Sequence, residues 1–115
     1  MPIEIYQGRT LYRTIRIKAD GQPYTLQSGE KILFGVKRGK WSGEYLIFKT
    51  LTSNDEIGGG YPLVLTPEDT DILTGYHKYD VGVALLDGSY HDIQSNDDFI
   101  VRSVTTHKGD DLNAE

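Results

Sequence analysis

The stretch that decides the fold is residues 76–104, YHKYDVGVALLDGSYHDIQSNDDFIVRSV. Its first half alternates apolar and polar residues and places Val81, Val83 and Leu85 at every second position. An alternation with a period of two predicts a β-strand that buries one of its faces. A second alternating run follows the dipeptide Asp87-Gly88, which is a strong signal for a tight turn between antiparallel strands. We therefore predict a β-hairpin that turns at Asp87 and Gly88.

Similar alternating runs occur through the rest of the chain. One of them has Ile32, Phe34 and Val36 at every second position, which places these side chains on the same face of a strand and predicts that they point inward. The runs that we interpret as strands are residues 3–7, 9–18, 24–26, 31–38, 44–51, 61–65, 79–85, 90–94 and 99–105. Turn residues separate these runs. The sequence thus predicts an all-β fold of seven to nine short strands.

Three of the connecting segments have recognisable features. Thr66-Pro67-Glu68-Asp69 is typical of a helix start, since threonine caps, proline fits the first helical position and the acids complement the helix dipole. We expect one short helical turn near residues 67–73. Residues 52–60 are polar and end in three glycines, which predicts a flexible loop. Residues 95–98 interrupt the last alternating run, as a bulge or a second turn would.

Antiparallel strands with so little helix are expected to pack as two sheets face to face. We predict an Ig-like antiparallel β-sandwich over residues 1–106, followed by a polar tail at 107–115. Leu73, Gly75 and Tyr79 have the spacing of a tyrosine corner, in which the tyrosine hydroxyl bonds to nearby backbone. The alternative is that Tyr79 is an aromatic residue at the edge of the core.

The composition excludes several classes of protein. The chain has no cysteine, which rules out disulfides, thiolate metal sites and cysteine catalysis. Its net charge of −5 argues against nucleic-acid binding, which needs an excess of Lys and Arg. No apolar run approaches the roughly 20 residues that span a membrane, and the first residues do not resemble a signal peptide. We expect no membrane or nucleic-acid partner and no secretion by a signal peptide.

The residues that could carry chemistry do not form a recognisable site. His77 and His91 could approach each other across the hairpin, but a zinc ion needs three or four ligands, so we interpret both as partly exposed histidines at strand ends. A structural calcium ion between acidic loops is an alternative, although no calcium-loop motif occurs. The sequence shows no combination of acid, base and nucleophile. We predict no catalytic residue, no cofactor and no metal ligand.

Exposed aromatic residues are the other candidates for function. Trp41 lies in a loop flanked by glycines, where it could stack on a sugar, anchor a partner protein or fold back over the core. Tyr24 and Tyr61 lie in short runs that we predict to be exposed edge strands and contact sites. A carbohydrate-binding module would use Trp41 together with Tyr45 or Tyr90 as stacking platforms.

One family resemblance brings a functional expectation. The run from Tyr79 to Gly88, followed by Phe99, Val101 and Val104, resembles the closing hairpin of Ig-like β-sandwich domains in virion proteins of phages that infect Gram-positive bacteria. Residues 16–26 and 32–37 are similar to earlier strands of that family, which includes the N-terminal domain of baseplate upper proteins. The resemblance implies a non-enzymatic structural module of the tail or baseplate type. It would form homo-oligomers or bind other virion proteins, in the virion or in the bacterial cytoplasm before assembly.

Overall fold

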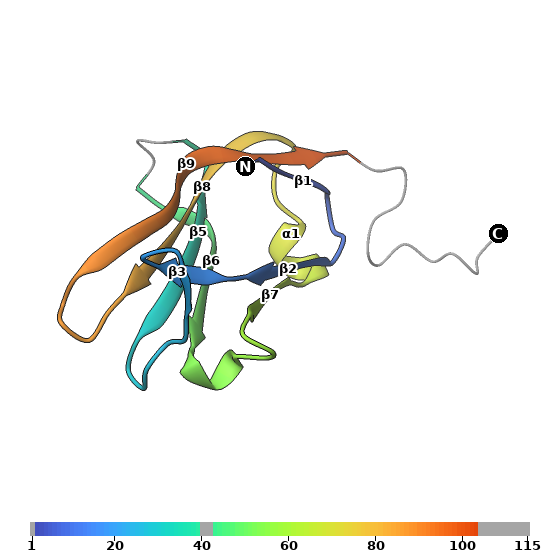
Figure 1. Cartoon of the computed structure of the whole chain (residues 1–115). Coiled ribbons are helices and arrows are strands. Elements are labelled where there is room, and N and C mark those ends of the chain that lie inside the picture. Colours follow the sequence, from blue (N-terminus) through green and yellow to red (C-terminus); the bar gives the residue numbers. More distant parts are fainter. Residues whose placement is uncertain (1, 40–42, 104–115) are drawn as a thin grey trace.

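The structure is a computed structural model that describes residues 2–39 and 43–103 (Figure 1). The described part of the chain forms strands with two short helices between them, so the fold is all-β as predicted. The strands are β1 (Ile3–Tyr6), β2 (Leu11–Ile15), β3 (Ile17–Ala19), β4 (Gln22–Tyr24), β5 (Lys31–Lys37), β6 (Tyr45–Thr52), β7 (Tyr61–Leu65), β8 (Gly75–Ala84) and β9 (Tyr90–Arg102). The helices are the 3-10 helix η1 (Ser53–Asp55) and the α-helix α1 (Pro67–Thr70).

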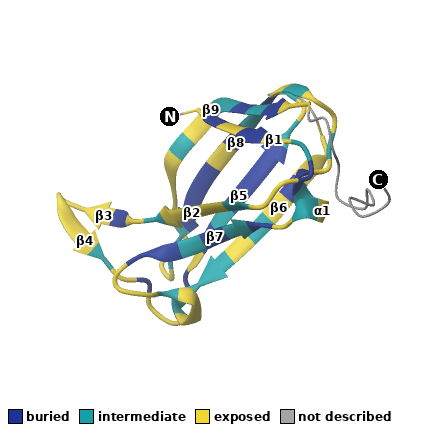
Figure 2. Cartoon of the chain, turned by 90° about the vertical axis from the view of Figure 1, so that its right-hand side faces the viewer, coloured by how far each residue is buried: buried dark blue, intermediate teal, exposed yellow. Residues whose placement is uncertain are grey.

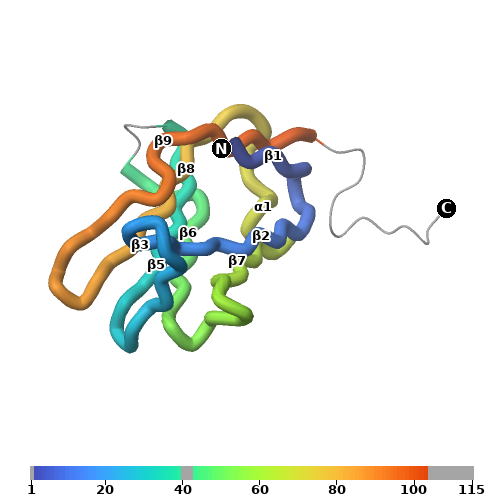
Figure 3. Tube along the Cα trace, in the orientation of Figure 1, coloured from blue at the N-terminus to red at the C-terminus, as the bar shows by residue number. Residues whose placement is uncertain are grey.

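The strands form one five-stranded sheet and two strand pairs. The large sheet has the order β1-β9-β8-β5-β6, while β2 pairs with β7 and β3 pairs with β4. We predicted antiparallel pairing throughout, but β1 runs parallel to β9, so the sheet is mixed (Figure 3). In this register Ile3 lies opposite Phe99 and Ile5 opposite Val101, which brings buried side chains of both strands onto one face.

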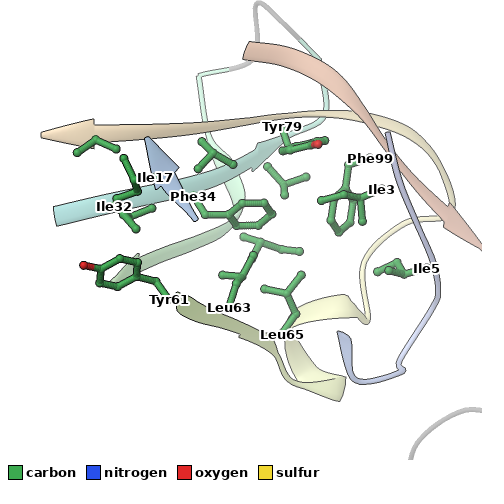
Figure 4. Packing of buried hydrophobic residues seen from close by; sticks show 14 of the residues in the cluster. Ile3, Ile5, Ile17, Ile32, Phe34, Tyr61, Leu63, Leu65, Tyr79 and Phe99 are labelled. Carbon is green, nitrogen blue, oxygen red and sulfur yellow. The ribbon is translucent and has the colours of Figure 1, made fainter. Parts of the chain in front are cut away.

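The core lies on the inner face of the large sheet, across which the β2–β7 pair packs (Figure 2). Phe34 of β5 lies above Leu63 and Leu65 of β7, and the predicted inward residues Ile32 and Val36 are fully buried beside it (Figure 4). The buried apolar residues are Ile3, Ile5, Ile17, Leu26, Ile32, Phe34, Val36, Ile47, Tyr61, Leu63, Leu65, Tyr79, Val81, Val83, Phe99 and Val101. The single cluster joins the large sheet, both strand pairs and the loop before β5.

The predicted hairpin is present, with a longer loop than the two residues expected. β8 ends at Ala84 and β9 begins at Tyr90, and the amide of Leu85 donates to the carbonyl of Ser89 over 2.9 Å. Gly88 has a φ of +89°, which favours glycine, whereas Asp87 keeps a negative φ and its carboxylate accepts from the Ser89 amide. A two-residue type I′ turn needs positive φ at both positions, so this loop belongs to another class.

A bulge interrupts the pairing of the same two strands where the sequence indicated one. The register of β8 and β9 shifts on both sides of Val81, and Asn96 has a φ of +53°. The Asp80 carboxylate accepts from the Asn96 amide and holds the bulge in place. β9 therefore continues as one strand from Tyr90 to Arg102 instead of ending at Gln94.

The predicted helical turn is α1, which is shorter than expected and ends at Thr70. Thr66 and Asp69 form a reciprocal capping box, and the Thr70 hydroxyl donates to the carbonyl of Arg9 over 2.6 Å. Residues 52–60 are more ordered than the predicted flexible loop. Thr52 and Asp55 form a second capping box around η1, and Ile57 bridges to Gly60.

The proposed structural residues of the tyrosine corner occupy special positions. Gly75 begins β8 with a φ of +123°, a value that favours glycine. Tyr79 is buried, with its ring 5.8 Å from that of Phe34 and 6.3 Å from that of Phe99. It is thus a central core residue instead of an aromatic at the core edge, while the corner hydrogen bond itself stays a prediction.

Tyr61 was predicted to be an exposed contact residue, and this is wrong. Its side chain is 0 % exposed, and its hydroxyl accepts a hydrogen bond of 2.7 Å from the amide of Leu26, which is also buried. The sequence could not show this, because Leu26 is 35 residues away. Tyr61 joins the loop before β5 to strand β7.

We predict that Tyr61→Phe lowers the free energy of unfolding by about 1–3 kcal/mol, because it leaves the buried Leu26 amide without an acceptor. Urea denaturation followed by circular dichroism measures this change. Tyr12→Phe is the matched control, since Tyr12 is 69 % exposed, and it should change stability by less than about 0.5 kcal/mol. Equal stability of wild type and Tyr61→Phe would contradict the assigned role.

Candidate interaction surfaces

The two histidines of the ordered hairpin lie far apart along it. His77 pairs with Phe99 and His91 pairs with Val83, so they are at opposite ends of the β8–β9 ladder. His77 was predicted to be partly exposed, but it is 1 % exposed, and its Nε2 lies 2.7 Å from the carbonyl oxygen of Leu73. Nε2 therefore carries the proton, and the buried Nδ1 has no hydrogen-bond partner among the described residues. No cluster of three potential metal ligands occurs in residues 2–39 and 43–103.

The outer face of the large sheet carries exposed aromatic side chains, which we call the outer aromatic patch: Tyr45, Phe48 and Tyr90. Tyr45 and Phe48 have ring centroids 4.8 Å apart, and the Lys37 ammonium lies 4.6 Å from the centroid of the Tyr45 ring. Each of the three rings is about half exposed. Burial and the Asp92 carboxylate raise the pKa of the Tyr90 hydroxyl, so this group is a neutral donor and acceptor at physiological pH.

Two glycines of the outer face make room for these rings. A Cβ atom at Gly35 would overlap the ring of Tyr45, and one at Gly82 would overlap the ring of Tyr90. Both glycines alternate with core residues of β5 and β8, so the rings lie directly against the backbone of the outer face. The rings and the glycine backbone together form an apolar surface.

A small polar cavity borders the patch. It has a volume of about 200 Å³ and is lined by Gly35, Lys37, Gly39, Lys78, Asp80, Ser95 and Asn96. The bulge of β9 supplies two of these residues. The cavity therefore offers charged and amide groups next to the Tyr45 ring.

A larger space, which we call the hairpin cleft, lies between the β3–β4 pair and the start of β9. Its volume is about 570 Å³, and it is lined by Arg16, Ile17, Lys18, Ala19, Asp20, Tyr24, Val83, Leu85, His91, Asp92 and Ile93. The predicted contact residue Tyr24 is half-buried in its wall. Trp41, the third predicted contact residue, lies outside the described residues.

The buried carboxylate of Glu30 ties together the two sides of the hairpin cleft. One carboxylate oxygen accepts from the Tyr24 hydroxyl at 2.7 Å and from the Gln27 amide at 2.8 Å, and the other accepts from the Leu86 amide at 3.2 Å. The Gln27 amide and the Tyr24 hydroxyl lower the pKa of Glu30, and the bond to Glu30 raises the pKa of Tyr24. Glu30 thus links the β3–β4 pair to the loop after β8.

The sequence did not predict that Tyr45, Phe48 and Tyr90 form one patch. It also did not predict that Glu30 connects the β3–β4 pair to the loop after β8. It named Tyr45 and Tyr90 only as companions of Trp41, and it did not name Phe48. Gly35 gave a hint of the patch. It is an outward-facing glycine in an otherwise apolar strand, which indicates that a neighbouring side chain, here Tyr45, lies close to the backbone. Glu30 gave no signal, because its link to the β8–β9 loop depends on Leu86, which is 56 residues away in the sequence.

We predict that Glu30 contributes stability above pH 4.5, its usual pKa, and that this contribution is lost as the pH falls through its lowered folded-state value. The sign follows because the unfolded chain binds a proton at Glu30 more readily than the folded protein does. Thermal denaturation between pH 7 and pH 3 should therefore show a steeper acid loss for wild type than for Glu30→Gln. The control Asp92→Asn changes an exposed carboxylate and should keep the wild-type slope. Parallel profiles of wild type and Glu30→Gln would refute this prediction.

Comparison with known proteins adds no assignment. No protein-family model matches the chain, and no curated protein matches it either. Within the described residues, neither helix has the length and apolar character needed to cross a bilayer. The functional conclusion therefore depends on the surfaces described above and on the family resemblance of the sequence.

Proposed function

We propose that this protein is a non-enzymatic structural module of a phage or prophage particle, of the tail or baseplate type, and that its Ig-like β-sandwich acts through protein contacts. The resemblance to virion domains, which covers most of residues 9–105 as a pattern, supports the phage context. The partner would be another copy of the chain or another virion protein. The module would reside in the virion, or in the bacterial cytoplasm before assembly.

The observation that carries the proposal is the outer aromatic patch. Its rings are about half exposed and lie against Gly35 and Gly82 on the outer face of the large sheet. Large aromatic side chains held in fixed positions are the residues that contribute most to protein interfaces, because they bury much area and lose little entropy. A contiguous group of them on the surface indicates a contact site.

The ion pairs on the outer face of the large sheet favour a second copy as the partner. On the same outer face, Lys78 pairs with Asp98 over 2.6 Å, and Arg102 pairs with Glu4. Both signs therefore occur side by side, so the face does not repel a copy of itself. A two-fold contact through this face would place the patch of one copy against that of the other.

We predict that the wild-type protein forms oligomers and that the double variant Tyr45→Ser/Phe48→Ser, which loses two rings, weakens the association by roughly 700-fold. Each lost ring at the centre of an interface costs about 2 kcal/mol or more, and 1.4 kcal/mol corresponds to a factor of ten. Size-exclusion chromatography with light scattering over a concentration series measures the association.

Tyr12→Ser is the matched control, because Tyr12 is an exposed tyrosine on β2 and not on the outer face of the large sheet. It should leave the association unchanged, and circular dichroism should show that all variants stay folded. A wild-type protein that stays monomeric at about 1 mM, with no head or tail genes beside its own gene, contradicts the proposed function.

A carbohydrate-binding module is the second candidate, and one observation favours it. The Tyr45 ring lies over Gly35 at the rim of the small polar cavity, so a sugar ring could stack on Tyr45 while its hydroxyls bind Lys37 and Asp80. Trp41 and Tyr90 would be further stacking residues. A glycan array with wild type and Tyr45→Ala tests this candidate. Saturable binding that Tyr45→Ala abolishes would support it, and the absence of any bound glycan would remove it.

A further inference from the structure

The walls of the hairpin cleft are strand edges. Residues 16–20 line one wall and residues 91–93 line the other, each as an uninterrupted run. Successive side chains of a strand point to opposite faces, so a run of consecutive lining residues indicates that the backbone edge itself borders the space. The two runs include strand β3 and the beginning of strand β9.

Each of these strands has one edge without a described partner. β3 pairs with β4 alone, and β9 pairs with β8 on one side and with β1 only from Phe99 onward. In the described part of the chain, no strand pairs with the second edge of β9 between Tyr90 and Gln94. Unpaired backbone amides and carbonyls on a strand edge are a template for a further strand.

The interior of the cleft is suited to the side chains of such a strand. Val83 on the inner face of β8 is buried at the base of the cleft, whereas Leu85 just after β8 is half-buried and Ile93 of β9 is 42 % exposed, so apolar surface is open to a ligand. The Tyr24 hydroxyl is already bound to Glu30. The cleft thus offers apolar contact from side chains and hydrogen bonds from backbone.

The two walls are fixed relative to each other before any ligand binds. Glu30 bonds to Tyr24 at the end of β4 and to Leu86 in the loop after β8, so one buried carboxylate connects both sides of the cleft. A strand that enters a preformed space loses less free energy to reorganisation of the protein.

We propose that the hairpin cleft binds an extended segment of a partner protein as an added β-strand between β3 and β9. The proposal rests on the proposed function, because it assumes that the protein works through protein contacts. The strand part of this wall is β3, so a bound segment pairs with it over about 3 residues, or about 10 Å at about 3.3 Å per residue. Every second side chain of that segment is apolar and faces Val83, Leu85 and Ile93.

A strand explains the cleft better than a small molecule or a sugar. Two backbone edges present alternating donors and acceptors along their length, and an extended peptide repeats donors and acceptors with the same period. A sugar stacks on the open face of an aromatic ring, whereas Tyr24 is half-buried in the wall and its hydroxyl is bound to Glu30.

The test uses a synthetic peptide, acetyl-Lys-Thr-Val-Thr-Val-Thr-Lys-amide, as the probe. Main-chain bonds supply most of the affinity in strand addition, so a generic alternating sequence is sufficient. The natural chain has no cysteine, so Ile93→Cys can carry a single environment-sensitive fluorophore at the cleft. We expect a saturable fluorescence change with a Kd between about 10 μM and 1 mM, the range of weak to moderate affinities.

Three controls distinguish strand addition from non-specific binding of the peptide. The same peptide methylated at every second backbone nitrogen keeps its side chains but loses donors, and should bind at least tenfold more weakly. Ala19→Trp fills the cleft and should reduce binding by a similar factor, with folding checked by circular dichroism. A fluorophore at Ile57→Cys, on an exposed residue outside the cleft, should give no saturable change.

Hydrogen exchange measured by NMR gives a readout that does not depend on the label. The backbone amides of residues 91–93 on the open edge should exchange quickly in the free protein and at least tenfold more slowly with the peptide bound. Unchanged exchange, no saturable binding, or equal binding of the methylated peptide overturns the proposal.

Peptide binding in the hairpin cleft does not depend on self-association through the outer aromatic patch. Tyr45→Ser/Phe48→Ser should bind the peptide as wild type does, because these residues do not line the cleft. If the wild-type protein oligomerises but the peptide does not bind, the strand-addition proposal alone fails. If the protein stays monomeric and the peptide binds, the cleft is a peptide site and the oligomer proposal fails.

Discussion

The contact among the rings of Phe34, Tyr79 and Phe99 is the interaction on which the rest of the structure depends. The centroids of these rings lie 5.8 to 6.3 Å apart, and each ring comes from a different strand of the large sheet. Such pairs contribute about 0.5–1.5 kcal/mol each beyond the area they bury. They also fix which parity of β5, β8 and β9 points inward, because a shift by one residue would move all three rings to solvent.

Fixing the inner parity also determines the outer face. Once Phe34 points inward, its neighbour Gly35 must point outward, and Gly82 follows from Val81 in the same way. The outer face then has two positions without side chains, and Tyr45 and Tyr90 lie over them. The packing that stabilises the core therefore also places the aromatic rings that we propose as the contact surface.

The sequence predicted those features that depend on neighbours along the chain. The inward positions of Ile32 and Val36, the capping of α1 and the β8–β9 hairpin all follow from short patterns. It failed where burial depends on distant partners. Tyr61 is buried because the Leu26 amide needs its hydroxyl, and His77 is buried on the inner face of β8, where it lies opposite Phe99 of β9. The hairpin cleft could not be predicted either, because its two walls are more than 70 residues apart in the sequence.

The two proposed surfaces differ in what they can recognise. The outer aromatic patch presents side chains, so the fit of a partner depends on which residues that partner carries. The hairpin cleft presents backbone edges, so a ligand must first be an extended peptide. Its alternating apolar side chains are a second, weaker requirement. Glu30 stabilises the cleft and takes no part in the patch, which lies on the opposite face of the sheet. Because the two surfaces lie on different faces, the proposed contact with a second copy would leave the proposed strand site accessible.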